Sequence, residues 1–266
     1  MNTQSTIALR AGARMPVLAL GTWELTDDTA GTVAHALDIG YRMIDTACDY
    51  GSQRGIGEAL RRQGKRNDVY LVTKVEETDD AYQATKNYLG EIGVDYTDLM
   101  LIHRPPDEGV GEALWAGLVR ARKEGLARDI GVSNYSIEQM QALARATGEM
   151  PVVNQIEWSP FGYSTAMLEF CKRNDIVIQA YSPLTRTERL GDRRLKEIAA
   201  RYRRTPAQIL IRWNLQLGTV PLPKANQQRH LEENIDVFEF EITDEDMSVL
   251  GGLNERYSSL GSLAYA

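Results

Sequence analysis

Short apolar segments alternate with longer amphipathic ones along the whole sequence, and this alternation restricts the chain to few folds. Strands that alternate with helical patterns form parallel sheets, and eight such units in roughly 250 residues favour a closed barrel over an open sheet. We therefore predict a single (β/α)8 TIM-barrel domain over residues 1–266. The expected strands are 18–23, 41–45, 68–74, 98–103, 127–132, 152–155, 176–181 and 219–223. The expected helices are 29–39, 52–62, 80–92, 111–124, 136–146, 165–173, 193–202, 206–217, 228–235 and 243–250.

The two ends of the chain do not follow this alternation. Residues 6–9 and 14–18 read as the arms of a β-hairpin around Ala11-Gly12. The tail from Asn254 to Ala266 is rich in serine and shows no period, so we expect irregular structure there.

Composition excludes several classes of protein. The formal net charge of −7 argues against a nucleic-acid surface. No apolar run reaches the ~20 residues of a membrane span, and no signal peptide is visible at the start. The sequence has only two cysteines, far apart, which fits a reducing compartment. Together with three distant histidines, they offer no spacing typical of metal ligands. The sequence has no coiled-coil heptad run, so we expect a monomer. The other features of the composition predict a cytoplasmic protein without metal, membrane or nucleic-acid partners.

Polar residues stand at the end of every predicted strand. The carboxyl ends of barrel strands open at one face, where active sites of this fold lie. A polar residue at one strand end is common, but the full set, with Asp, Lys and His on neighbouring strands, indicates a site. These terminal residues are Thr22-Trp23, Asp45, Lys74, His103, Ser133-Asn134, Asn154-Gln155, Tyr181-Ser182 and Lys224.

Asp45, Tyr50, Lys74 and His103 form a set suited to delivering a proton to a carbonyl oxygen. A phenol with a pKa of about 10 is a poor acid at neutral pH. A lysine ammonium about 4 Å away contributes ~4 kcal/mol at an effective dielectric near 20, on the order of three pKa units. We therefore expect Lys74 to lower the pKa of Tyr50, Asp45 to keep Lys74 charged, and His103 to bind the oxygen.

No side chain supplies a hydride, so the chemistry requires a cofactor. Gly55-Ile56-Gly57 is only a fragment of the Rossmann fingerprint, because residue 60 is Leu, and its context favours helix packing. The other candidate is Lys224 with Asn226, Gln227, Arg229 and His230, just before a predicted helix. Cations at a helix N-terminus make an anion site, although a basic cluster by itself is usually a solvated face.

Together these residues resemble the aldo-keto reductase family over nearly the whole chain. The resemblance implies a (β/α)8 barrel with an N-terminal hairpin capping the barrel bottom, and reduction of aldehydes or ketones by NADPH. The matching motifs are Gly21-Thr22-Trp23, Asp45-Thr46-Ala47-x-x-Tyr50-Gly51, Val72-Thr73-Lys74, Leu101-Ile102-His103, Gly131-Val132-Ser133-Asn134, Asn154-Gln155 and Tyr181-Ser182-Pro183-Leu184.

The resemblance also implies roles for individual residues. Tyr50 would be the general acid, supported by Lys74 and Asp45, while His103 orients the carbonyl. The implied cofactor residues are Gly21, Thr22, Trp23, Asp45, Ser133, Asn134, Gln155, Tyr181, Ser182, Leu184, Lys224, Ala225, Asn226, Arg229, His230, Glu233 and Asn234. The implied substrate residues are Trp23, Tyr50, Glu76, His103 and Arg104.

Two departures from the family pattern bear on specificity. The family's Lys-Ser-x-x-x-x-Arg run grips the adenosine 2′-phosphate, but Ala225 and His230 replace its Ser and Arg here. We expect a weakened preference for NADPH, with use of NADH left open. Glu76 and Arg104 occupy places where many members have Trp, which predicts a more polar pocket mouth with these two residues paired.

Two other functions remain open at the level of sequence. A barrel of this kind can bind nucleotide as a regulatory or structural protein without turnover. Following the absorbance of reduced nicotinamide in the presence of aldehydes distinguishes such a protein from a reductase. A barrel hydrolase or isomerase could use Asp45 and Glu76 as an acid–base pair. It would need no nicotinamide, so a nucleotide titration separates it.

Overall fold

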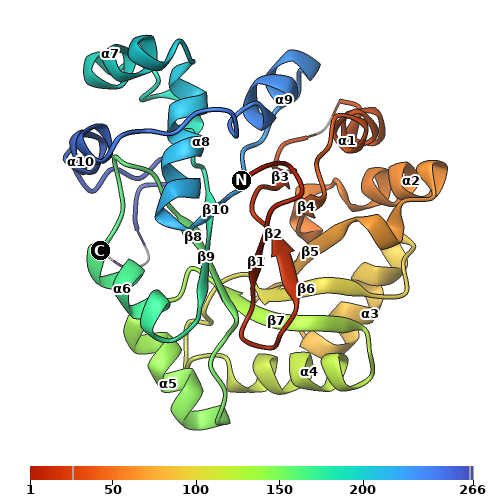
Figure 1. Ribbon diagram of the computed structural model, residues 1–266. Helices are drawn as coiled ribbons and strands as arrows, with labels where there is room; N and C mark the ends of the chain where they lie inside the picture. Colours follow the sequence, from red (N-terminus) through yellow and green to blue (C-terminus); the bar gives the residue numbers. More distant parts are fainter. Residues whose placement is uncertain (26, 264, 266) are drawn as a thin grey trace.

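The computed structural model describes residues 1–25, 27–263 and 265, and shows strands surrounded by a ring of helices (Figure 1). Eight parallel strands pair in sequence order, from β3 to β10. The strands are β3 (Leu20–Gly21), β4 (Met43–Asp45), β5 (Tyr70–Val75), β6 (Thr97–Ile102), β7 (Ala127–Ser133), β8 (Val153–Glu157), β9 (Val177–Tyr181) and β10 (Val220–Pro221).

Hydrogen bonds between the first and last strands close the sheet. The Ala19 N–H donates to the Pro221 carbonyl and the Gly21 N–H to the Pro223 carbonyl, both at 3.1 Å. A Cβ on Gly21 would lie 2.7 Å from the carbonyl oxygen of Leu222, so glycine permits this close approach. β3 and β10 are shorter than the predicted 18–23 and 219–223, because only their central residues pair in the regular ladder.

The helices fall where the helical spacing predicts them, within a few residues at each end. Most of their N-termini carry a side-chain cap that satisfies free backbone N–H groups, while α2, α4 and α9 have none. Ser136 and Thr205 each form a capping box, and Asp80 accepts from the Gln83 N–H. The helices are α1 (Thr29–Asp38), α2 (Gln53–Gln63), α3 (Ala81–Ile92), α4 (Glu112–Lys123), α5 (Ile137–Thr147), α6 (Thr165–Arg173), α7 (Arg193–Tyr202), α8 (Pro206–Leu217), α9 (Gln228–Ile235) and α10 (Asp244–Gly251).

The N-terminal hairpin lies across the barrel at the end opposite the carboxyl ends of the strands. Its arms are β1 (Thr6–Ala8) and β2 (Arg14–Pro16), in the centre of the view (Figure 1). Buried Met15 packs into the same apolar cluster as Met43 and Val177, the first residues of β4 and β9. The prediction of a hairpin at the barrel bottom is therefore confirmed.

The glycines of α2 mark close contacts between helices. A Cβ on Gly57 would lie only 1.6 Å from the Ile92 carbonyl oxygen, and one on Gly55 would lie 2.6 Å from the Cβ of Thr29. These contacts agree with the interpretation that Gly55-Ile56-Gly57 serves helix packing.

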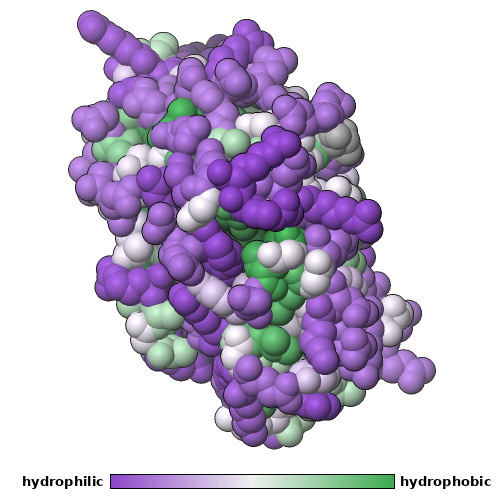
Figure 2. Space-filling model, turned by 90° about the vertical axis from the view of Figure 1, so that its right-hand side faces the viewer, coloured by the Kyte–Doolittle hydropathy of each residue, from purple (hydrophilic) through white to green (hydrophobic). Residues whose placement is uncertain are grey.

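The outer surface over α1, α2 and α3 is mostly hydrophilic, with a narrow hydrophobic strip exposed along it (Figure 2). Within residues 1–25, 27–263 and 265, no helix combines the length and the apolar character that a membrane crossing requires.

Candidate active site

A cleft of about 650 Å³ opens at the carboxyl ends of the strands. Its volume is within the range of small-molecule sites, roughly 300–1,000 Å³. Its wall includes Asp45 from β4, Ser133 from β7, Gln155 from β8 and Tyr181 from β9. The predicted strand ends thus meet at one mouth, because all eight strands run in the same direction.

Lys74 connects the carboxylate of Asp45 to the phenol of Tyr50. Side chains alternate along β5, which places Lys74 inside the barrel with no exposed surface. Its Nζ lies 2.9 and 3.1 Å from the two carboxylate oxygens of Asp45, 2.8 Å from the Thr46 carbonyl and 3.4 Å from the Tyr50 hydroxyl. Tyr50 ends a single 3-10 turn, Cys48–Tyr50, directly after β4.

The pKa of Tyr50 differs from the value expected from the sequence. Burial raises the pKa of Tyr50, and the Lys74 charge offsets only part of that effect. The expected net lowering of the Tyr50 pKa is therefore wrong, since burial cannot be read from the sequence. For Lys74, burial alone would lower the pKa, but Asp45 and Tyr50 together hold it above its ordinary value. At neutral pH the lysine is charged and the phenol keeps its proton.

His103 lies beside Tyr50, with ring centroids 5.9 Å apart in an edge-on arrangement. Its Nδ1 is 2.8 Å from an oxygen of Glu76, the residue that follows β5. The other oxygen of Glu76 lies 3.7 Å from the Arg104 guanidinium, so the expected pairing of Glu76 with Arg104 is present. Asp45 and Glu76 are bonded to different bases, Lys74 and His103, and do not form the acid–base pair considered above.

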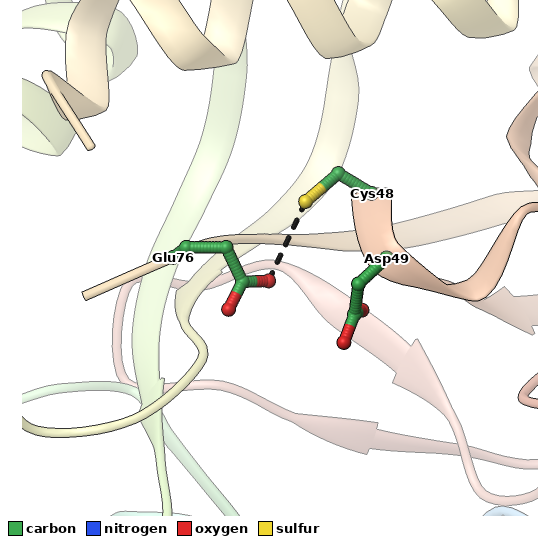
Figure 3. Close-up of side chains that lie close together, drawn as sticks. All are labelled: Cys48, Asp49 and Glu76. Carbon is green, nitrogen blue, oxygen red and sulfur yellow. Dashed lines mark hydrogen bonds between the residues drawn. The ribbon is translucent and has the colours of Figure 1, made fainter. Parts of the chain in front are cut away.

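Cys48, Asp49 and Glu76 gather one ligand atom each within 4.8 Å of one another (Figure 3). The Cys48 thiol donates to Glu76 at 3.4 Å. Burial, aided by Glu76, raises the pKa of Cys48 to about 11, so the sulfur is a neutral thiol at physiological pH. Metal binding uses the thiolate. A hydrogen bond joins Cys48 to Glu76, and we assign no metal to the cluster.

Amide side chains occupy the centre of the cleft. Gln155 directs both its N–H groups inward, to Asp45 at 2.8 Å and to Gln179 at 2.9 Å. Asn134 donates to the His103 carbonyl and to Ser133, and it accepts from the Tyr181 hydroxyl at 2.8 Å. Because the Gln155 N–H groups are engaged, its amide oxygen is the atom that can accept from a carboxamide.

The loop after β9 forms the wall beside Tyr181. Ser182, Thr185, Arg186 and Thr187 all have positive φ, between 46° and 73°. Such a conformation is uncommon for residues other than glycine, and strain of this kind concentrates at binding sites. The Arg186 guanidinium lies 4.1 Å from the centre of the Trp23 ring, so the stack joins this loop to the residues after β3.

The residues predicted for the adenosine end lie around the start of α9. Lys224 is part of the cleft wall. The Glu233 carboxylate accepts from the Thr205 hydroxyl at 2.5 Å, and the Arg229 guanidinium donates to Gln227 at 2.8 Å. The remaining predicted residues of this end lie outside the cleft wall; they are Ala225, Asn226, Arg229, His230, Glu233 and Asn234.

Part of the cleft wall was not predicted from the sequence. The C-terminal tail contributes Leu260 and Ser262. Buried Glu157, at the end of β8, accepts hydrogen bonds from Ser258 at 2.6 Å and from the Ser259 N–H at 2.7 Å. The tail has no period, and about a hundred residues separate it from Glu157. An unexplained carboxylate at a strand end was the only signal. Asp49, Arg186 and Thr187 were also missed.

Comparisons with known proteins identify the class that this fold and cleft define. The model of the aldo/keto reductase family matches residues 17–255. An aldo-keto reductase of Mycobacterium tuberculosis is 40% identical over 256 residues, which cover 94% of this chain and 91% of that protein. The 9,11-endoperoxide prostaglandin H2 reductase of Trypanosoma cruzi is 37% identical over 259 residues, with 94% and 91% covered.

Solved structures agree with this class. An aldo/keto reductase from Brucella melitensis superposes with a TM-score of 0.89 at 34% identity, covering 94% of this chain and 99% of that one. A Bombyx mori aldo-keto reductase in complex with NADP gives 0.90 at 30% identity, with 96% and 94% covered. The chain belongs to the aldo/keto reductase family. It is an oxidoreductase that reduces carbonyl groups with a nicotinamide cofactor.

Proposed function

We propose that Tyr50 is the general acid of this reduction, with Lys74, Asp45 and His103 in supporting roles. The contact of the Lys74 ammonium with both Asp45 and the Tyr50 hydroxyl carries the proposal. A bound reduced nicotinamide supplies the hydride. Tyr50 gives its proton to the carbonyl oxygen, Lys74 stabilises the phenolate that remains, and Asp45 holds Lys74 charged. His103 binds the oxygen as it gains negative charge.

The raised pKa of Tyr50 suits the donor role in one respect. A general acid must carry its proton when the substrate arrives, and Tyr50, with a pKa raised above its ordinary value, does so at neutral pH. The same burial makes transfer harder, because it penalises the phenolate. Lys74 offsets that penalty from 3.4 Å.

We also propose NADPH as the preferred cofactor, with NADH accepted. The fit rests on the residues present. Ser133, Asn134 and Gln155 would hold the carboxamide, and Tyr181 would stack on the nicotinamide ring. The path to Lys224 at the phosphate end would be lined by the end of β3 with the residues after it (Gly21, Thr22, Trp23) and by the loop after β9 (Ser182, Leu184). The Lys224 ammonium and the Arg229 guanidinium could pair with a 2′-phosphate, and the His230 imidazole could donate a hydrogen bond to it.

The NADP complex of the Bombyx mori neighbour supports this choice, whereas Ala225 and His230 weaken the phosphate grip. Paired NADPH and NADH dissociation constants test it. We expect NADPH to bind more tightly by a modest factor. Tighter binding of NADH would overturn the preference.

For the substrate, we propose a small carbonyl compound bounded by Trp23, Tyr50, Glu76, His103 and Arg104. Arg104 lines the cleft and Glu76 pairs with it from outside the cleft wall, so this end of the cleft is polar. We further propose that residues 1–266 form one domain that acts as a cytoplasmic monomer. Two free cysteines support the reducing compartment.

The substitution Tyr50→Phe tests the role of Tyr50. We expect turnover to fall by about 100- to 10,000-fold, the usual contribution of a general acid, while nucleotide binding persists. Steady-state reduction of an aldehyde panel at the reduced-nicotinamide absorbance band measures turnover, and a nucleotide titration measures binding. Near-wild-type turnover would remove Tyr50 from the acid role.

A matched control is available on β5. The buried hydroxyl of Tyr70 has no hydrogen-bond partner within the described part of the chain. Tyr70→Phe should therefore leave turnover and nucleotide binding unchanged. A protein that binds nucleotide but reduces none of the aldehydes, even as wild type, would instead be a regulatory or structural barrel.

A further inference from the structure

The hydrogen bond between Glu76 and His103 determines which ring nitrogen carries the first proton. Their contact, Oε1 to Nδ1, is 2.8 Å. Burial alone would raise the pKa of Glu76, but the bond to His103 and further contacts hold it below its ordinary value. Glu76 is therefore a carboxylate at neutral pH and can only accept. The hydrogen in this bond belongs to Nδ1 of His103.

This arrangement fixes the character of the other ring nitrogen. A neutral imidazole with its proton on Nδ1 has a bare lone pair on Nε2. His103 is part of the cleft wall, so Nε2 is the atom left for a substrate oxygen. A lone pair repels a carbonyl oxygen and accepts from an alcohol O–H. Only the doubly protonated ring donates from Nε2.

We propose that Glu76 is a positioning residue that holds the proton on Nδ1 of His103, so that the ring assists carbonyl reduction only as the imidazolium. This inference rests on the proposed function for the place of His103 in the reaction. The balance of the step is unchanged: the carbon gains the hydride, the oxygen gains the Tyr50 proton, and His103 keeps both of its protons.

The other charged groups near the ring do not compete for Nδ1. An oxygen of Asp49 lies 4.0 Å from Nδ1, beyond hydrogen-bond distance. Arg104 contacts Glu76 at 3.7 Å and Glu77 at 4.0 Å. The Cys48 thiol donates to Glu76, and the Lys74 ammonium donates to Tyr50, so neither is bonded to the ring itself. The Tyr50 ring lies edge-on to the His103 ring. Glu76 alone is hydrogen-bonded to the ring among the described residues.

Nitrogen-15 NMR of the imidazole rings tests the proton position directly. The chain has three histidines, so loss of one signal set in His103→Gln assigns it. In the wild-type protein we expect the neutral His103 ring to carry its proton on Nδ1. In Glu76→Gln the amide can donate to Nδ1, so the tautomer with the proton on Nε2 becomes populated. A neutral wild-type ring protonated on Nε2 would overturn the proposal.

Glu77→Gln is the matched control. It removes a neighbouring carboxylate that also faces Arg104 but has no contact with His103. We expect its His103 tautomer to match the wild type. If Glu77→Gln changes the His103 tautomer as much as Glu76→Gln does, the loss of a nearby negative charge is responsible rather than the hydrogen bond to Nδ1. That result would overturn the proposal.

The pH profile of kcat/KM gives a second test. In the wild type, reduction should fall as the pH rises, because only the doubly protonated ring donates from Nε2. Burial keeps the pKa of Tyr50 above its ordinary value. In Glu76→Gln the neutral ring can donate from Nε2, and this decline should flatten, whereas Glu77→Gln should follow the wild type. An equal decline in all three proteins would overturn the proposal.

The two tests separate this inference from the proposed function. The tautomer is read from the protein without turnover, so it stands even if Tyr50→Phe remains active. If Tyr50→Phe is inactive but the wild-type tautomer is wrong, the proposed function survives and the role of Glu76 fails.

Discussion

The two sides of the cleft are built differently. The side that handles the proton stands on neighbouring strands, with Asp45 on β4 and Lys74 on β5, and its polar atoms are bonded within a rigid, closed sheet. Another part of the wall comes from the loop after β9 and the C-terminal tail. Buried Glu157 fixes that tail through hydrogen bonds to Ser258 and Ser259. Strands and the residues that shortly follow them define the chemistry, whereas longer irregular segments define part of the space in front of it.

This difference predicts how each side responds to substitution. A change on the strand side should affect both turnover and folding, because the same buried charges serve both. A change on the loop side should affect ligand affinity and local order and leave the chemical step intact. The three predictions below test this division, from the largest expected effect to the smallest.

Lys74→Met should have the largest effect. Removing one partner of a buried ion pair typically costs about 3–5 kcal/mol, because the other charge stays buried without it. Lys74 is fully buried and Asp45 nearly so. We expect a loss of this size in the free energy of unfolding by denaturant titration. Turnover should fall on the order of 100-fold or more, since the phenolate of Tyr50 loses its counter-charge.

The double variant of Lys74→Met with Asp45→Asn separates the two losses. It removes the orphaned charge while an amide oxygen remains for Gln155, which donates to Asp45 in the native site. Stability should recover in part, and turnover should not. Turnover of Lys74→Met within threefold of wild type would contradict the role of the lysine in proton transfer.

The same division explains what could be predicted from the sequence. The alternation of apolar and amphipathic segments predicts the barrel, and α7, α8 and α9 begin and end at the residues that the pattern indicates. The strand-side residues were accessible for the same reason. Asp45, Lys74 and His103 each end or follow an apolar strand, and parallel strands bring such ends together.

What the sequence could not provide depends on contacts between distant segments. The sign of the Tyr50 pKa shift depends on burial, which arises from the whole barrel mouth. The placement of Leu260 and Ser262 depends on hydrogen bonds from the tail to Glu157. A serine-rich segment has no hydrophobic periodicity from which such a contact could be predicted, so its position follows only from the folded structure.

Substitution of Glu157 should produce an intermediate effect. Hydrogen bonds to a charged group contribute roughly 1.5–3 kcal/mol, so Glu157→Leu should release the tail. We expect faster hydrogen exchange over residues 258–263 and a KM for the carbonyl substrate raised about tenfold, with kcat within threefold. Glu157→Gln keeps one acceptor oxygen, so its hydrogen exchange and its KM should lie between those of the wild type and of Glu157→Leu. If kcat falls as strongly as in Lys74→Met, the two sides are not separable.

Arg186→Gln should have the smallest effect. The stack of Arg186 on Trp23 joins the two loops over the cleft at 4.1 Å, and an exposed cation–π contact contributes about 0.5–1 kcal/mol. Nucleotide should therefore dissociate about two- to fivefold faster, with kcat for the chemical step unchanged. Stopped-flow fluorescence can follow this, because Trp23 is 37% exposed while the other three tryptophans are fully buried.

A matched substitution in the same loop decides whether the stack itself is responsible. Arg189 stacks on Tyr257 and pairs with Glu255 of the tail at 2.5 Å, outside the cleft wall. Arg189→Gln should leave nucleotide dissociation unchanged and speed hydrogen exchange in the tail instead. Equal dissociation rates in Arg186→Gln and the wild type would show that the loop is held by its backbone conformation alone, because the positive φ angles from Ser182 to Thr187 would persist without the stack.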